Sequence, residues 1–229
     1  MKQIKLNLPG EKDYFMQEAL KTLRTNLQFC GQDIRVVMFT SVGENEGKST
    51  VTLSLAKSFA DLGKKVLVID ADMRKSVMAG RNTDAMNPKG LSEVLNGLAK
   101  LEDVVCQAEN SSAFVLFSGQ YPPNPVELLS GKYFTDLISR AREQFDYVIV
   151  DTPPLGRVVD AAVIAQNCDG AVLLIGHNKV PYHDAQEVIA QIRKSNCKML
   201  GVVRNNSSVN SHTYYHHHTK KDKAENEMA

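Results

Sequence analysis

The sequence lacks the segments that would carry it into or across a membrane. Its longest uninterrupted apolar runs, 66–69 and 171–175, fall far short of the about 18 residues needed to cross a bilayer. Residues 1–9 contain no apolar core of about 7–15 residues and no small-residue cleavage site, so they do not resemble a signal peptide. We therefore expect a cytoplasmic chain without a transmembrane helix.

Cysteines are few, and neither sign of charge is in excess. The four cysteines, Cys30, Cys106, Cys168 and Cys197, are too far apart to form a CxxC metal pair and lie in or beside apolar stretches. Lys plus Arg number 27 against 26 Asp plus Glu, a formal charge of +1. This balance excludes non-specific binding to nucleic acid through net charge, so any partner must be recognised by a local site.

The length of 229 residues corresponds to about 1.5 average domains, and 43% hydrophobic residues suffice for one sizeable core. We predict a single domain over residues 1–205. Residues 206–229 are polar and charged, a composition that cannot support a core, and are predicted to be a disordered tail.

Short apolar runs rich in β-branched residues alternate with stretches of helical spacing. Most of the runs are continuous, as in strands buried on both faces, which predicts an α/β fold: a doubly wound, mostly parallel sheet with helices on both faces. Segment 73–90 is predicted to be a mobile loop. The expected strands are 35–41, 65–71, 113–118, 146–152, 170–176 and 198–205. The expected helices are 13–29, 49–62, 126–145, 160–167 and 181–195.

The stretch 42–50 is predicted to be a phosphate-binding loop (P-loop) between a strand and a helix. Gly47 allows close approach of the backbone, Lys48 neutralises phosphate charge, and the Ser49 hydroxyl can ligate Mg²⁺. The match is imperfect because Val42 stands where the strict motif has Gly. A chance Gly-Lys-Ser-Thr is the alternative.

Three aspartates follow predicted strands. Asp70 and Asp72 end one strand and Asp151 ends another, and ligands bind at this edge of a parallel sheet. A lone Asp here would often be a turn residue. Three of them around a P-loop indicate Mg²⁺ and general-base chemistry.

Together these motifs resemble the bacterial tyrosine kinases, the P-loop kinases of capsule and exopolysaccharide systems. The most specific elements are 70–74, Asp-Ala-Asp-Met-Arg, and the Walker B stretch 151–154, with a further signature in 118–130. The resemblance implies a P-loop NTPase fold of the MinD and ParA type. Those partition and division-site ATPases carry an early P-loop lysine where this sequence has Gly43.

The resemblance implies a protein-tyrosine kinase that uses ATP and Mg²⁺. Lys48 and Ser49 would hold phosphates and metal, Asp151 would support the metal, and Asp70 and Asp72 would serve metal binding and activation of a tyrosine hydroxyl. Which of these two is the base stays open. The implied catalytic residues are Lys48, Asp70, Asp72 and Asp151, and the implied metal ligands are Ser49, Asp70 and Asp151.

Two departures from the family concern the nucleotide. Glu44 and Asn45 stand where the family has Pro-Gly, which makes the loop more acidic and is expected to weaken ATP binding by repulsion. Asn205 is implied to lie near the adenine, and Arg204 could stack on that base or point to solvent. The candidate nucleotide-binding residues are Gly43, Glu44, Asn45, Glu46, Gly47, Lys48, Ser49, Thr50, Arg204 and Asn205.

The first helix carries Glu18, Lys21 and Arg24, similar to the E-x-x-R-x-x-R element that joins subunits of the family into a ring. Lysine in place of the first arginine loses the bidentate fork and is expected to weaken that ring. A plain solvated helix face is the alternative.

The C-terminal tail offers Tyr214 and Tyr215, where the family has a dense tyrosine cluster. They are the expected autophosphorylation sites, modified in trans; an inert tail whose histidines bind metal adventitiously, or an engineered scar, is the alternative.

The resemblance further implies control of polysaccharide synthesis and export. The expected partners are a separate transmembrane activator or polysaccharide co-polymerase that recruits the chain to the inner face of the membrane, further copies of the chain, protein-tyrosine substrates and a tyrosine phosphatase. Met73, Val77 and Met78 could receive the activator or simply pack in the core. The competing function is an assembly or positioning ATPase switched by nucleotide, with water as acceptor.

Overall fold

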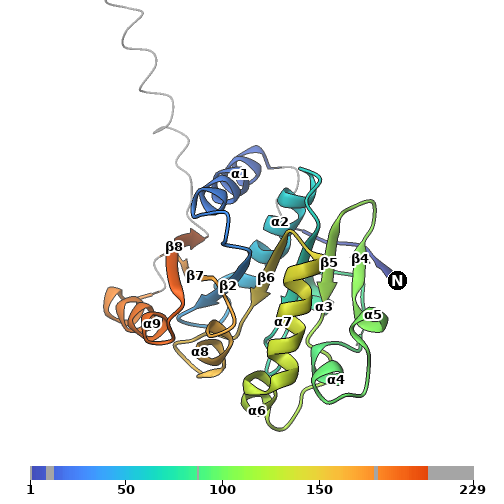
Figure 1. The fold of residues 1–229 in the computed structure, drawn as a ribbon. Helices are drawn as coiled ribbons and strands as arrows, with labels where there is room; N and C mark the ends of the chain where they lie inside the picture. The colour runs from blue at the N-terminus through green and yellow to red at the C-terminus, as the bar shows by residue number, and fades with distance from the viewer. Residues whose placement is uncertain (1, 9–12, 87, 178–179, 206–229) are drawn as a thin grey trace, which may run out of the picture.

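The computed structural model (Figure 1) describes residues 2–8, 13–86, 88–177 and 180–205. Its centre is an eight-stranded sheet in the order β1-β4-β5-β3-β6-β2-β7-β8. Neighbouring strands are parallel except for β4 and β5, so six strands run one way and β1 and β4 the other. The strands are β1 (Lys2–Ile4), β2 (Val36–Ser41), β3 (Val66–Asp70), β4 (Cys106–Ala108), β5 (Ala113–Leu116), β6 (Tyr147–Asp151), β7 (Gly170–Gly176) and β8 (Lys198–Asn205).

Helices cover both faces of this sheet, which confirms the predicted fold class. One face packs on α1 (Tyr14–Phe29), α2 (Lys48–Ala60) and α3 (Met78–Asn82). The other packs on α4 (Leu91–Leu95), α6 (Pro125–Ser130), α7 (Lys132–Gln144), α8 (Asp160–Ala165) and α9 (Tyr182–Lys194). The short α5 (Leu101–Val104) precedes β4, and in Figure 1 α7 lies in front of the sheet and α2 behind it. No helix in the described part of the chain is long and apolar enough to cross a membrane.

The central strands are apolar up to their C-terminal ends because both of their faces are buried. In β2, Val36 and Met38 belong to the core under α7 and α8, whereas Val37 and Phe39 belong to the core under α1 and α2. All four side chains are at most 3% exposed. The six predicted strands are all present, and they direct six parallel C-terminal ends to one edge.

The predicted helix 126–145 is wrong as a single element. It is two helices, α6 and α7, separated at Gly131, whose φ of −75° and ψ of 159° are extended. An extended residue interrupts the helical hydrogen-bond series, so α7 begins afresh at Lys132.

The predicted loop 73–90 also differs from the structure, since it contains α3. Met73 and Met78 are at most 1% exposed and pack in the two cores, while Val77 is 36% exposed. Of the three residues considered for a partner, both methionines therefore serve core packing. A five-residue helix with Gly80 inside it offers no periodic signal.

Candidate active site

The P-loop connects β2 to α2 at the C-terminal edge of the sheet. Gly47 precedes α2 with a left-handed φ of 91°, and Asn45 has a φ of 57°. A Cβ on Gly47 would lie 2.2 Å from Nδ2 of Asn205, so only glycine fits. This turn aims the first amides of α2 into the site, where they can bind phosphate oxygens.

Glu46 fixes the shape of the loop. Its side chain is buried, and its two carboxylate oxygens accept the main-chain N–H groups of Gly43 at 2.5 Å and Gly176 at 2.7 Å. Its carbonyl oxygen accepts a hydrogen bond from Nδ2 of Asn205 at 2.9 Å. Glu46 was predicted as a nucleotide contact, but the structure gives its carboxylate to β7 and to the loop itself.

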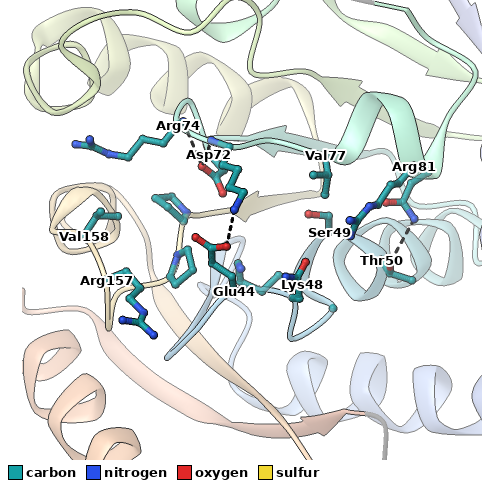
Figure 2. Close-up of a pocket in the computed structure, with 16 residues that line it drawn as sticks. Glu44, Lys48, Ser49, Thr50, Asp72, Arg74, Val77, Arg81, Arg157 and Val158 are labelled. Carbon is teal, nitrogen blue, oxygen red and sulfur yellow. Dashed lines mark hydrogen bonds and ion pairs between the residues drawn. The ribbon is translucent and has the colours of Figure 1, made fainter. Parts of the chain in front are cut away.

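A pocket of ≈ 300 Å³ lies against the P-loop (Figure 2). Of the candidate nucleotide residues, six line it: Glu44, Asn45, Gly47, Lys48, Ser49 and Thr50. Gly43, Glu46, Arg204 and Asn205 are not among its lining residues, and Arg204 is exposed at the end of β8. The other lining residues come from the turn after β3, from α3 and from the turn after β6, and are Asp72, Arg74, Lys75, Val77, Arg81, Asn82, Pro153, Pro154, Arg157 and Val158.

Asp70 and Asp151 form a carboxylate pair beside this pocket. They occupy matching positions on the parallel strands β3 and β6, and each is 1% exposed. Oδ2 of Asp151 accepts the Ser49 hydroxyl at 2.5 Å, and Oδ2 of Asp70 accepts the Ser76 hydroxyl. The remaining oxygen, Oδ1, of each is buried and has no hydrogen-bond partner among the described residues.

This burial changes the protonation of both acids. It raises the pKa of Asp70 to about 8, with a further increase from the charge of Asp151. It raises the pKa of Asp151 to about 6, against the opposing effects of the Lys48 ammonium and the Ser49 hydroxyl. Two buried, ionised carboxylates with unused oxygens cost free energy unless a proton or a cation compensates them.

The donor set fits Mg²⁺ bound together with a nucleotide. In the described part of the chain no three His, Cys, Asp or Glu side chains are grouped as a metal site. Mg²⁺ usually takes only one or two carboxylates and completes its shell with waters and phosphates. Asp70, Asp151 and the Ser49 hydroxyl provide such a partial set beside a phosphate-binding loop.

Asp72 differs from Asp70 in its surroundings. It is half-buried and lines the pocket, and its Oδ1 accepts the main-chain N–H groups of Arg74 at 3.2 Å and Lys75 at 2.9 Å. In Figure 2 Asp72 faces the P-loop residues Glu44 and Lys48 across the pocket. Its other oxygen is therefore placed to accept a proton from a group in the pocket.

The comparisons with known proteins agree with this geometry. The model of the family described as AAA domain matches residues 35–199. The tyrosine-protein kinase CpsD of Streptococcus agalactiae is 42% identical over 209 residues, 90% of this chain and 91% of that protein. The chain belongs to the bacterial tyrosine kinases.

Solved structures extend the same relationship. The kinase domain of the Escherichia coli tyrosine kinase ETK matches this kinase with a TM-score of 0.77 at 31% identity, over 84% of this chain and 77% of that one. The cell division ATPase MinD of Pyrococcus furiosus matches with a TM-score of 0.62 at 25% identity, over 74% and 71%. The predicted P-loop NTPase fold is confirmed, and this fold implies nucleotide binding.

Two ion pairs that were not predicted from the sequence hold the turn after β3. The Arg74 guanidinium contacts both carboxylate oxygens of Asp160, at 2.7 and 3.0 Å, and Asp160 is fully buried at the start of α8. The Lys75 ammonium lies 2.7 Å from Oε2 of Glu44. The hydrogen bond and charge of Lys75 lower the pKa of Glu44, so this carboxylate is ionised, and the ammonium offsets the negative charge expected to repel ATP.

The predicted oligomer contacts on α1 separate into two kinds. Lys21 and Glu18 form an exposed ion pair of 2.7 Å. Arg24 instead points to α2, where its Nη1 donates to the carbonyl oxygen of Ser58 at 2.6 Å and to its hydroxyl at 2.9 Å. Its guanidinium therefore contacts its own chain.

The predicted tail tyrosines, Tyr214 and Tyr215, lie outside the described residues.

Proposed function

We propose that this kinase uses ATP and Mg²⁺ to phosphorylate tyrosines in the C-terminal segment of another copy, Tyr214 and Tyr215. The observation that carries the proposal is the pair Asp70 and Asp151, each with a buried unpartnered oxygen, beside the Ser49 hydroxyl. A pocket for a neutral ligand does not require two buried carboxylates. A bound metal cation does, because their negative charge balances its positive charge.

The side chains of the pocket have different proposed roles. Lys48 and the first amides of α2 bind phosphates, and Ser49, Asp151 and Asp70 hold the metal, which would neutralise charge between phosphates. Asp72 is the general base, because it faces the pocket while the free oxygen of Asp70 is buried next to Asp151.

In the transfer, the tyrosine proton moves to the Asp72 carboxylate as the phenolic oxygen forms a bond to the γ-phosphorus. The bond from that phosphorus to the β–γ bridging oxygen breaks, and ADP leaves with the electron pair. The protein contributes alignment and charge compensation, which suffice for phosphoryl transfer.

The adenine is proposed to lie beside Asn205 and Arg204. Asn205 ends β8 next to the P-loop, since its amide binds the carbonyl of Glu46. Arg204 is exposed there and can stack on a base.

The cellular setting is also proposed. Copies assemble into a ring through α1, a transmembrane activator recruits the kinase to the inner face of the membrane, and a tyrosine phosphatase reverses the modification. The output is control of capsule or exopolysaccharide synthesis and export. The sequence resemblance supports these partners, and the exposed Glu18–Lys21 pair offers a polar contact for a neighbouring copy.

The test is phosphate mapping. Purified protein is incubated with MgATP, with and without the cytoplasmic segment of the membrane partner, and analysed by intact-mass and peptide mass spectrometry. We expect phosphate on Tyr214 and Tyr215 that is lost in Lys48→Met. Hydrolysis of ATP with no phosphotyrosine under both conditions would replace the kinase with the assembly ATPase.

A further inference from the structure

Lys75 is a second cation in the phosphate pocket, and no motif assigns it a role. It lines the pocket with Lys48, Ser49 and Asp72. Its main-chain N–H donates to the Asp72 carboxylate at 2.9 Å, and its ammonium lies 2.7 Å from Oε2 of Glu44 on the P-loop. The dashed line to Glu44 in Figure 2 marks this ion pair, which crosses the pocket between the two loops.

The two lysines enter the pocket from different sides. Lys48 is the first residue of α2, at the end where helix amides bind the β-phosphate. Lys75 extends from the turn that also carries Asp72, the carboxylate proposed above as the general base. In the proposed reaction the transferred phosphoryl group lies next to the base that activates the acceptor, so a cation on the turn that carries Asp72 is placed to contact it.

We infer that Lys75 binds the γ-phosphate of the nucleotide and that Glu44 holds its ammonium in the pocket until the nucleotide arrives. Lys75 then supplies, from the turn after β3, the second cation that the related ATPases carry early in the P-loop, where this chain has Gly43. This inference rests on the proposed function, because it needs a nucleoside triphosphate in this pocket.

Lys75 can leave the Glu44 carboxylate for the γ-phosphate at little cost, because the Glu44–Lys75 pair is exposed. The side chains of Lys75 and Glu44 are 68% and 50% exposed, and ion pairs in such surroundings contribute little to stability. A γ-phosphate carries more negative charge than a carboxylate, so it competes well for the ammonium. Glu44 then loses its partner, which is a cost that ADP does not impose.

The test compares binding of ADP and of a non-hydrolysable ATP analogue, both with Mg²⁺, by calorimetry on the full chain. For Lys75→Ala we expect analogue affinity to fall about 10- to 100-fold, the loss of one charge-assisted contact, with ADP affinity changed less than about twofold. Lys75→Arg should restore most of the analogue affinity, because it keeps the charge. Glu44→Gln should raise analogue affinity more than ADP affinity, since the lysine is released.

Two controls make the result specific. Lys100→Ala removes an exposed lysine that precedes α5, outside the pocket, and should leave both affinities unchanged. Lys48→Ala should weaken both nucleotides. An equal loss for ADP and analogue in Lys75→Ala, or no loss for either, overturns the inference.

The same experiment separates this inference from the proposed function. Wild-type binding of the analogue without any phosphotyrosine after MgATP would reject the kinase chemistry and leave the Lys75 result standing. Failure of the wild type to bind the analogue would reject both.

Discussion

Asp70 and Asp151 lie side by side at the ends of two adjacent parallel strands, and each has one carboxylate oxygen without a hydrogen-bond partner in the described part of the chain. Hydrophobic strands on both sides exclude water from this position. The two carboxylates, when ionised, are therefore stabilised by a bound cation. The P-loop then places the Ser49 hydroxyl on Asp151, which completes the protein part of the site.

The stability of the metal-free kinase should fall as the pH rises through these two groups. Their folded-state pKa values, about 8 for Asp70 and about 6 for Asp151, exceed the ordinary value of 3.8. Between about pH 4 and pH 8 the folded state therefore binds more protons than the unfolded state, and stability decreases with pH. Thermal unfolding from pH 5 to 8.5 measures this.

Mg²⁺ with ADP should flatten that decrease, because the cation replaces the protons. Asp70→Asn should unfold at a higher temperature than wild type at pH 8 without metal and gain less from Mg²⁺. A wild-type melting temperature that rises from pH 6 to pH 8 without metal would contradict the proposed carboxylate pair.

Asp72→Asn should separate the base from the metal ligands. We expect its tyrosine kinase kcat to fall by about 10²–10⁴-fold, the usual contribution of a general base, with Mg²⁺-dependent ADP affinity close to wild type. Asp151→Asn should instead weaken Mg²⁺-dependent binding. Steady-state kinetics and calorimetry on the two variants make the comparison, and loss of ADP binding in Asp72→Asn would move Asp72 into the metal site.

Glu46→Ala should distort the P-loop. It leaves the buried amide of Gly176 and that of Gly43 without an acceptor, at about 1–3 kcal/mol for each. Urea unfolding should show this loss, and ADP affinity should fall with it. The neighbouring exposed Glu44→Ala is the matched control, and equal stability of the two variants would show that Glu46 does not hold the loop.

Arg74→Ala should destabilise the kinase through Asp160. Removal of the guanidinium leaves a fully buried carboxylate unpaired, and because Arg74 is 41% exposed we expect about 1–3 kcal/mol rather than the full cost of a buried pair. The double variant Arg74→Ala/Asp160→Asn should recover part of this loss. Urea midpoints test both, and a double variant no more stable than the single one would argue against the pair.

Arg24→Ala should lower the stability of the single chain, since its guanidinium binds Ser58 on α2. We expect about 1–2 kcal/mol from the two lost hydrogen bonds. Glu18→Ala/Lys21→Ala should leave stability unchanged and reduce assembly. Urea unfolding and light scattering after size exclusion distinguish these outcomes, and an unaltered oligomer in the double variant would remove α1 from the proposed ring.

The sequence predicted the structure best where a position accepts only one type of residue. Strands buried on both faces are mostly apolar, so β2 and β7 can be recognised in the sequence as continuous apolar runs. Gly47 and Lys48 are required by any phosphate-binding loop of this kind. By contrast, β1 and β4 have three residues each and give no alternation to read.

The missed features depend on contacts between distant positions. Glu46 was predicted to contact the nucleotide, and its role in holding the loop depends on the amide of Gly176 in β7, 130 positions later. The Glu44–Lys75 pair joins two loops 31 positions apart. Charge alone could not show that Lys75 compensates Glu44, because that depends on how both loops leave the sheet.

Phosphoryl transfer between copies is measured most directly on a mixture of two variants with MgATP. The mass of each intact chain is then determined by mass spectrometry. Lys48→Met keeps the tail tyrosines but lacks the phosphate-binding lysine, and Tyr214→Phe/Tyr215→Phe keeps the site but lacks these acceptors. We predict phosphate on the Lys48→Met chain, only when the other variant is present. Absence of phosphate from that chain, under conditions in which wild type labels its own tail, would contradict transfer between copies.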